Sequence, residues 1–379
     1  MSLIELFLKA EHHLRPRLSF LPPSLFTKLY SNGRNKFLQI LYSLENNPYY
    51  LPPDTLSRTL WGIHFQQPLF NAAGMFKYGE GYEFVASQGA GAYLAGTSTS
   101  RKRTGNFKNG IRTPFTAYPL SKTASNWLGL PNNSHKEIIQ NLQKIQKIKG
   151  CPIGLSISAS PELDPSLAIE ELLDGLFRIH DSQIDFIELN ESCPNVEGHS
   201  NSNEVLDSQL LLRLKSISDR FLSKRNRQLP VIVKFSNDTS LHQVPELVST
   251  LVILGFDGVN FGNTSTQYQK HRIEIHPSEI TRYDYFTTTF GGGLSGNILK
   301  LSSFDLSTIA VKHLKTLSLK NEFHIIRTGG IDSFFDISFE NETSPSLYQW
   351  YTGYFNNLSL YGMNLYKKFY ERLPTIIQK

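Results

Sequence analysis

Eight short apolar segments alternate with longer amphipathic segments from about residue 70 onward, and the segments lack the polar–apolar alternation of half-exposed strands. These two observations predict an α/β protein whose parallel strands are buried on both faces: a (β/α)8 TIM barrel, preceded by an N-terminal helical extension. An open doubly wound sheet is the alternative, but no Gly-x-Gly-x-x-Gly follows the first strand. The expected strands are 69–73, 92–95, 153–157, 186–189, 231–235, 258–261, 323–326 and 346–350. The expected helices between them include 134–147, 166–179, 207–222, 244–254 and 303–319.

Residues 1–50 are expected to form the helical extension, and residues 51–379 the barrel domain. One face of a first helix carries Leu3, Phe7, Ala10 and Leu14, and Pro22-Pro23 then interrupts the chain before Ser24, which is expected to cap a second helix. The second helix carries Leu25, Leu29, Phe37, Ile40, Leu41 and Leu44 at helical spacing. Residues 1–45 contain six basic and three acidic residues, so the two expected helices form a basic amphipathic pair of helices. Two interpretations stay open: contact with an anionic membrane surface, or a cap over the end of the barrel.

The composition excludes several classes of protein. The chain has 379 residues, 40% of them hydrophobic and 19% charged, and its net charge of +5 is spread too evenly to indicate nucleic acid. The short basic run Arg101-Lys102-Arg103 is typical of a solvated loop. Two cysteines, Cys151 and Cys193, provide neither a disulfide framework nor metal-ligand spacing, so we expect no metal and a reducing, intracellular setting. No apolar run approaches the ~18 residues of a transmembrane helix, and no signal peptide is expected.

The segment Glu188-Leu189-Asn190-Glu191-Ser192-Cys193-Pro194-Asn195 follows the fourth expected strand directly. Carboxamides offer donors and an acceptor to a planar ligand rich in C=O and N–H groups. A cysteine between them can act as a general base, because its ordinary pKa is not far from neutrality. Taken alone, the segment also fits turn-forming asparagines and a small buried thiol.

Two glycine clusters, 291–296 and 328–331, stand beside the last two expected strands. Glycine lets backbone N–H groups approach phosphate oxygens, and barrels often bind phosphate in the loops after strands seven and eight. Lys234, at the end of the fifth expected strand, would place a cation at the barrel mouth. It could stabilise the negative charge of a reduced flavin, or it could form an ion pair within the barrel.

Taken together, these motifs resemble the dihydroorotate dehydrogenases, which are FMN-dependent barrel enzymes of pyrimidine synthesis. The similarity covers about residues 60–370 and keeps the order of the family's motifs. The matching stretches are 71–77, 95–99, 126–132, 190–195, 263–264, 292–296, 328–331 and 349–353.

The resemblance implies roles for individual residues. Cys193 would be the catalytic base that takes the C5 proton of dihydroorotate. The substrate would be bound by Lys77, Asn126, Trp127, Leu128, Gly129, Leu130, Asn190, Asn195, Asn263 and Thr264. FMN would be bound by Ala73, Gly74, Thr97, Asn190, Lys234, Gly296, Gly329, Gly330, Tyr351 and Thr352.

The chain combines marks of two classes within this family. Cys193 and Leu128-Gly129-Leu130-Pro131-Asn132 resemble the soluble class, which uses fumarate or NAD. The N-terminal helices and the placement of Lys77 resemble the membrane-associated quinone class, although a second arginine expected shortly after Arg112 is absent. Ser156, Gly262 and Ser344-Pro345 also depart from the family pattern and would weaken the flavin site.

We therefore expect an enzyme that oxidises dihydroorotate with FMN and passes electrons to a membrane quinone. In this interpretation residues 1–45 make a peripheral contact at the cytoplasmic face of the membrane. A soluble cytoplasmic enzyme with fumarate as acceptor is one alternative. A catalytically idle relative that serves as an interaction protein is the other.

Overall fold

The computed structural model describes residues 3–42, 49–191, 206–337 and 342–371. Its centre is a sheet of eight parallel strands, and all eight coincide with strands expected from the sequence. In chain order they are β3 (Leu69–Asn71), β4 (Tyr93–Ser98), β9 (Ile153–Ile157), β10 (Phe186–Asn190), β11 (Val231–Phe235), β12 (Gly258–Phe261), β14 (His324–Thr328) and β15 (Leu347–Trp350). Each pairs with its neighbours in the order β3-β15-β14-β12-β11-β10-β9-β4.

The sheet closes on itself between its first and last strands. The backbone N–H of Gly74 donates to the carbonyl of Gly96 at 2.7 Å, and that of Gly96 donates to Phe76 at 3.1 Å. Phe76 and Ala95 also form a parallel bridge. The fold is therefore the predicted barrel and not an open doubly wound sheet.

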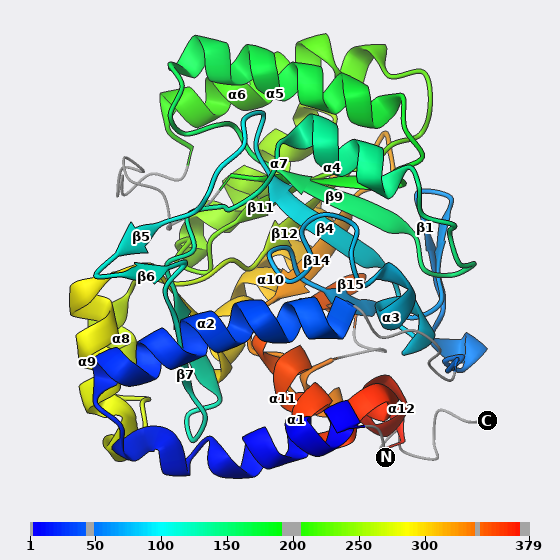
Figure 1. Cartoon of the computed structure of the whole chain (residues 1–379). Coiled ribbons are helices and arrows are strands. Elements are labelled where there is room, and N and C mark those ends of the chain that lie inside the picture. Colours follow the sequence, from blue (N-terminus) through cyan, green and yellow to red (C-terminus); the bar gives the residue numbers. More distant parts are fainter. Residues whose placement is uncertain (1–2, 43–48, 192–205, 338–341, 372–379) are drawn as a thin grey trace.

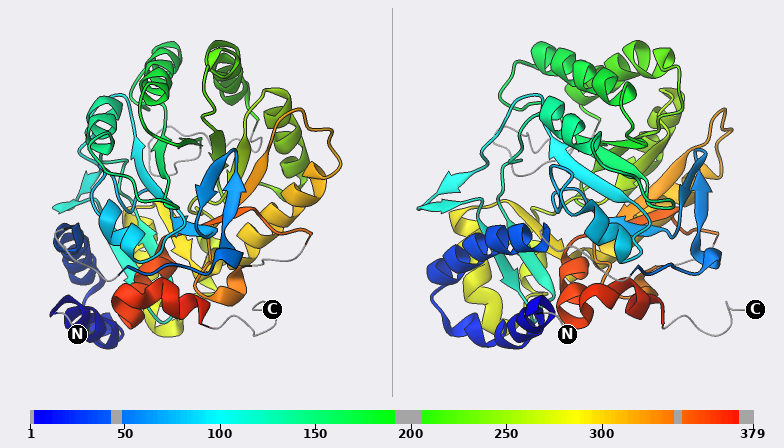
Figure 2. Two further views of the ribbon diagram at one scale, coloured as in Figure 1. Left: turned by 90° about the vertical axis from the view of Figure 1, so that its right-hand side faces the viewer. Right: turned by 45° about the vertical axis from the view of Figure 1, so that its right-hand side comes forward.

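Helices cover the outside of the barrel, as Figures 1 and 2 show. They are α3 (Tyr82–Ser87), α4 (His135–Leu142), α5 (Pro165–His180), α6 (Ser208–Arg220), α7 (Val244–Ile253), α10 (Lys300–Leu314), α11 (Thr352–Tyr361) and α12 (Leu365–Tyr370). The five longer predicted helices are present, and none of their ends differs from the predicted one by more than five residues. Short 3-10 turns are η1 (Arg17–Phe20), η2 (Asp54–Leu56), η3 (Leu222–Lys224), η4 (Leu241–Gln243), η5 (Pro277–Glu279), η6 (Asn297–Leu299), η7 (Phe334–Asp336) and η8 (Gly362–Asn364).

The interior of the barrel changes from apolar to polar along its axis. At the amino ends of the strands, Phe65, Phe70, Phe186 and Ile232 belong to one buried apolar cluster. The hairpin of β1 (Arg58–Leu60) and β2 (Ile63–Phe65) closes this end. Since side chains of a strand alternate between its two faces, the residues two and four positions after Phe186 also point inward, and these are polar. The polar layer therefore lies toward the carboxyl ends, where barrel enzymes place their sites.

Insertions build a second, smaller layer over that end. Strands β7 (Phe115–Tyr118), β8 (Thr123–Asn126) and β13 (Gly293–Gly296) form an antiparallel sheet. Beside it lie the hairpin of β5 (Phe107–Lys108) and β6 (Ile111–Arg112) and the helices α8 (Tyr268–Arg272) and α9 (Ile280–Thr289). None of these short antiparallel strands was predicted from the sequence.

The N-terminal extension forms two helices, α1 (Leu3–Leu14) and α2 (Pro23–Tyr42). Helix α1 packs on α11, and α2 packs on β7 and α9, as the views in Figures 1 and 2 agree. The expected cap at Ser24 is wrong, because α2 begins one residue earlier, at Pro23. Proline is well suited to the first helical turn, where its missing N–H costs nothing.

Specific contacts fix α2 on the barrel. Ser31 Oγ accepts a hydrogen bond from the backbone N–H of Phe115 at 2.9 Å, and the Arg282 guanidinium lies 3.6 Å from the ring centroid of Phe26. The extension therefore packs on the barrel domain. It also presents an apolar outer surface, because several large apolar residues are exposed: Leu6, Leu14, Leu18, Phe20, Leu25, Leu29 and Ile40. Among the described helices, none is both long enough and apolar enough to cross a membrane.

Candidate active site

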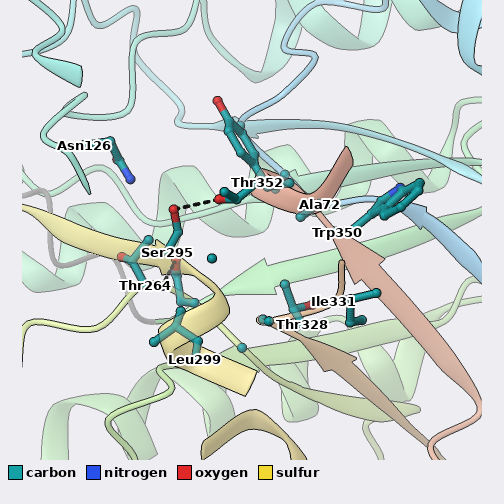
Figure 3. Close-up of a pocket in the computed structure, with 18 of the residues that line it drawn as sticks. Ala72, Asn126, Thr264, Ser295, Leu299, Thr328, Ile331, Trp350 and Thr352 are labelled. Carbon is teal, nitrogen blue, oxygen red and sulfur yellow. Dashed lines mark hydrogen bonds between the residues drawn. The ribbon is translucent and has the colours of Figure 1, made fainter. Parts of the chain in front are cut away.

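A single pocket at the carboxyl ends of the strands gathers most of the residues singled out from the sequence. Of the expected substrate-binding residues, those that line it are Lys77, Asn126, Leu128, Leu130, Asn190, Asn263 and Thr264. All ten expected cofactor-binding residues line it as well: Ala73, Gly74, Thr97, Asn190, Lys234, Gly296, Gly329, Gly330, Tyr351 and Thr352. These residues come from widely separated parts of the chain, so the fold assembles one site from the scattered motifs. Figure 3 shows a part of this pocket.

Four expected site residues do not contribute to the described lining. Trp127 points toward Phe290, with ring centroids 6.3 Å apart. Gly129 supports the loop instead: its carbonyl accepts from Arg103, and an added Cβ would come within 2.2 Å of the Asn106 side chain. Cys193 and Asn195 lie outside the described residues.

Asn190 is the centre of a hydrogen-bonded chain across the pocket. Its Nδ2 donates to Thr97 Oγ1 at 3.0 Å, and its Oδ1 accepts from Asn263 Nδ2 at 3.1 Å. The Asn263 side-chain oxygen in turn accepts from the backbone N–H of Thr264 at 2.9 Å. This chain fixes the orientation of two amides, which determines where each presents a donor or an acceptor to a ligand.

Ser156, one of the departures from the family pattern, takes part in the same arrangement. Its hydroxyl shares a 3.0 Å hydrogen bond with Thr97, although Ser156 itself does not line the pocket. Gly262, the second departure, does line it, and an added Cβ there would come within 1.9 Å of the Thr328 carbonyl. The close approach of these two backbones explains why glycine occupies this position.

Lys77 and Asn126 lie on loops and strands above the barrel mouth. The backbone N–H of Lys77 donates to Glu80 Oε1 at 2.8 Å, which fixes the loop, and burial raises the pKa of Glu80. Asn126 ends β8, and its Nδ2 donates to the Gly293 carbonyl at 3.3 Å. A cation and an amide therefore line the pocket.

Another side of the pocket is lined by glycines, among them Gly296 and Gly330, and is called the glycine rim below. Gly296 and Gly330 have φ angles of +100° and +70°, which favour glycine, and a Cβ on Gly330 would come within 2.2 Å of Lys300 Cα. The chain thus passes so close to the start of α10 that no side chain fits. Ser295 and Thr352 share a 3.0 Å hydrogen bond here, drawn in Figure 3, which places the start of α11 against β13.

Charges behind this rim are paired. Lys122, which lines the pocket, donates to Asp332 at 2.7 Å, and Lys300 pairs with Asp336. Although burial opposes it, the ion pair with Lys300 and backbone N–H donors hold the pKa of Asp336 below its ordinary value. The place of Lys122 in the pocket could not be predicted from the sequence, because no motif surrounds this residue.

Lys234 forms the ion pair within the barrel that was one of the two interpretations left open. It is 3% exposed, lines the pocket, and pairs with Glu188 on β10 at 3.2 Å. No role for Glu188 was predicted from the sequence, where it appears only within the motif at residues 188–195.

Another missed residue comes from the extension. Arg34 on α2 reaches Tyr351, a pocket-lining residue, and donates to its hydroxyl at 2.8 Å. Arg34 also lies 5.9 Å from the ring centroid of Phe115, in the segment after Arg112 where a second arginine was expected. A cation from another part of the chain therefore occupies this neighbourhood.

The residues present fit a flavin mononucleotide. The glycine rim, with the uncapped amino end of the ten-residue helix α11, provides backbone donors suited to a phosphate. Thr264 Oγ1 is buried at the pocket and has no hydrogen-bond partner among the described residues, which leaves a polar atom for a ligand. Lys234 supplies a cation for the electron-rich edge of the ring system.

The fold and the pocket are those of a barrel protein whose pocket lining would suit a phosphate-bearing cofactor beside a small polar ligand. The sequence model of the family described as Dihydroorotate dehydrogenase matches residues 55–375, so the chain belongs to the dihydroorotate dehydrogenase family, whose members generally bind FMN.

Relatives and solved structures agree with this assignment. A protein of Pectobacterium atrosepticum named dihydroorotate dehydrogenase (quinone) is 27% identical over 298 residues, which cover 78% of this chain and 82% of that protein. A protein of the same name from Cyanothece is 26% identical over 331 residues, covering 87% of this chain and 82% of its own length. The crystal structure of the Eimeria tenella protein in complex with ferulenol superposes with a TM-score of 0.72 at 20% identity, covering 91% of this chain and 90% of that one. This last similarity concerns the fold.

Proposed function

We propose that this protein oxidises dihydroorotate to orotate with bound FMN and passes the electrons to a membrane quinone. The observation that carries the proposal is the convergence of Lys77, Asn126, Asn190 and Asn263 on one pocket that also has a glycine rim suited to a phosphate. Three carboxamides suit the alternating C=O and N–H groups of a cyclic diamide, and a lysine suits its carboxylate. Asn195, outside the described residues, would add a fourth amide.

The reaction removes two electrons and two protons from the substrate ring. Bound FMN would supply the acceptor for the hydride that leaves C6. Cys193 would take the proton from C5, and the hydrogen-bonded chain through Asn190 would hold the ring so that both C–H bonds are correctly oriented. Lys77 would bind the carboxylate throughout, so it contributes to affinity more than to the chemical step.

The acceptor is assigned from the extension. Helices α1 and α2 pack on the barrel next to the pocket, and the extension exposes apolar side chains, among them Phe20 of the turn η1, which is 90% exposed. Basic residues of the extension, among them Lys9, Arg17, Lys28 and Lys36, are also exposed. Exposed apolar and basic side chains on surface helices are typical of a contact with an anionic membrane. A quinone dissolved in that membrane would then lie close to the pocket.

A soluble acceptor is the second candidate, because the cysteine in the base position resembles the class that uses fumarate. The two candidates share the first half-reaction and differ only in what reoxidises the protein.

The test is anaerobic mixing of the purified protein with dihydroorotate, followed by absorbance at the flavin band. Bleaching at a rate that saturates with dihydroorotate is expected. Bound flavin that stays oxidised would overturn the proposed substrate, and absence of flavin would favour an idle relative. Adding a short-chain quinone or fumarate to the reduced protein then distinguishes the acceptors: recovery of colour with quinone supports the proposal, whereas recovery with fumarate alone supports the soluble alternative.

A further inference from the structure

A layer of polar side chains fills the barrel directly beneath the pocket. It contains Glu188 on β10, Lys234 on β11, Asn260 on β12, Thr328 on β14 and Gln349 on β15. All five are buried, and Glu188 is only 1% exposed. Barrel interiors are usually filled by branched apolar side chains, so a complete polar layer needs a physical reason. Burying it is costly unless every group is paired.

Glu188 is the acceptor at the centre of this layer. Its Oε1 accepts from Lys234 Nζ at 3.2 Å, and its Oε2 accepts from Asn260 Nδ2 at 2.9 Å and from Gln349 Nε2 at 2.8 Å. Three donors directed at two oxygens fit an ionised carboxylate, which only accepts hydrogen bonds.

The remaining contacts leave little freedom to the layer. Gln349 Oε1 accepts from Lys234 at 3.4 Å and from Asn260 at 3.1 Å. Thr328 Oγ1 donates to Asn260 Oδ1 at 2.9 Å. The amides are therefore oriented by Glu188 and Thr328, and Lys234 is held from below by two acceptors.

The two charges of the layer lie at different depths. Lys234 lines the pocket, whereas Glu188 does not and lies behind it. The pocket therefore faces a positive charge with a compensating negative charge immediately beyond it. In a buried, weakly polarisable setting, such a counter-charge reduces the field that the cation exerts on a ligand.

We propose that Glu188 is a positioning residue that fixes the Lys234 ammonium and, by partly compensating its charge, sets the reduction potential of the flavin bound above it. The inference rests on the proposed function in so far as FMN occupies the pocket. Charge near a flavin tunes its electronics, and the reduced ring is the more negative form. Removing the carboxylate should therefore leave the cation less compensated and make the flavin easier to reduce.

The test compares the flavin midpoint potentials of wild type, Glu188→Gln and Glu191→Gln, measured against a reference dye. Glu191 is the matched control, because the same substitution three residues along removes a carboxylate that pairs outside the layer, with Arg213 at 2.5 Å. In the equilibrium with the dye, Glu188→Gln is expected to raise the ratio of reduced to oxidised flavin tenfold or more. For a two-electron couple this corresponds to an increase of about 30 mV in the midpoint potential. Glu191→Gln should keep the wild-type potential.

Glu188→Asp serves as the second variant, since it keeps the charge but moves it away from Lys234. It should shift the potential in the same direction as Glu188→Gln and by less, and it remains informative where the Gln variant does not retain flavin. An unchanged potential in the variants that bind flavin would overturn the inference, as would an equal shift in Glu191→Gln.

Failure of the inference and of the proposed function are separable. If dihydroorotate bleaches the wild-type flavin but the Glu188 variants keep its potential, only the role of Glu188 is lost. If dihydroorotate does not bleach it but the potential shifts as expected, the substrate is wrong and the inference holds. Absence of flavin from the wild-type protein would overturn both.

Discussion

Arg34 on α2 donates a 2.8 Å hydrogen bond to the hydroxyl of Tyr351, which lines the pocket at the start of α11. The same guanidinium nitrogen lies 3.4 Å from the carbonyl of Gly74, another pocket residue. The extension is therefore connected to the expected flavin site by a charged side chain as well as by apolar packing.

Replacing Arg34 by alanine should impair reoxidation by quinone without affecting reduction by dihydroorotate. The hydrogen bond from Arg34 to Tyr351 has a charged donor and contributes about 1.5–3 kcal/mol to holding α2 at the pocket. Because the quinone is proposed to dock beside α2, loss of this contact should raise the quinone KM roughly tenfold or more. The measurement is stopped-flow kinetics of the two half-reactions separately. Lys36→Ala, which removes an exposed cation two residues along the same helix, is the control and should leave both rates unchanged when a short-chain quinone is supplied without membranes. Equal slowing of both half-reactions would show that Arg34 only stabilises the fold.

Gly330→Ala should weaken FMN retention more than its backbone strain alone predicts. The new Cβ would come within 2.2 Å of Lys300 Cα, so the glycine rim and the start of α10 must separate. Gly255→Ala is a matched control, because Gly255 has a similar φ of +78° but no atom within 4 Å of an added Cβ. Both variants carry about 1–2 kcal/mol of left-handed strain. We expect the FMN dissociation constant to rise at least tenfold in the Gly330 variant only, measured by flavin fluorescence; similar values in the two variants would contradict a cofactor role for this rim.

The strands could be predicted because each is buried on both faces and so appears in the sequence as a continuous apolar run. Residues 153–157 and 231–235 show this clearly, since every residue of β9 and β11 is buried. The site residues were named from the resemblance, and the barrel brings those that follow its strands together because the carboxyl ends of the strands meet at one end.

Contacts formed between distant parts of the chain could not be predicted. The strands β5 and β6 have two residues each, too few for any periodicity to be detected. Arg34 precedes Tyr351 by 317 positions, and nothing near either residue indicates their contact. Glu188 had a visible signal, an acidic residue within an apolar strand, but the role of its charge depends on three partners from other strands.

Cys193→Ser should slow the reduction of bound flavin by dihydroorotate while FMN stays bound. Serine is a much weaker base than a cysteine thiolate near neutral pH, and loss of a general base typically costs about 10²–10⁴ in rate. Cys151→Ser is the control: Cys151 is fully buried away from the pocket, and burial raises the pKa of its thiol. Single-turnover mixing measures the effect directly. Unchanged flavin reduction in the Cys193 variant would remove this residue from its assigned role.

His135, the first residue of α4, makes the folded state sensitive to mild acid. Its Nδ1 shares a 2.8 Å hydrogen bond with Ser98, and its Nε2 is buried without a hydrogen-bond partner among the described residues. Burial lowers the pKa of His135 to about 4, against the opposing influence of Asp174 and Glu171 and with a further lowering by Arg178. The imidazole is therefore neutral in the folded protein at any pH well above 4.

The direction of the pH effect follows from comparing this pKa with the ordinary value of 6.5 in the unfolded chain. Because the unfolded chain binds the proton more readily, the stability associated with neutral His135 is complete above pH 6.5 and is lost as the pH falls from 6.5 toward 4. One pKa unit corresponds to about 1.4 kcal/mol, so between pH 7 and pH 5 the free energy of unfolding should fall by about 2 kcal/mol.

Urea titrations at pH 7 and pH 5 measure this fall in the free energy of unfolding. The glutamine of His135→Gln cannot take up a proton, so between pH 7 and pH 5 the free energy of unfolding of this variant should fall by about 2 kcal/mol less than that of the wild type. The control is His64→Gln, at an exposed position on β2, which should keep the pH dependence of the wild type. The same pH dependence in the wild type and the His135 variant would mean that other groups account for the acid sensitivity.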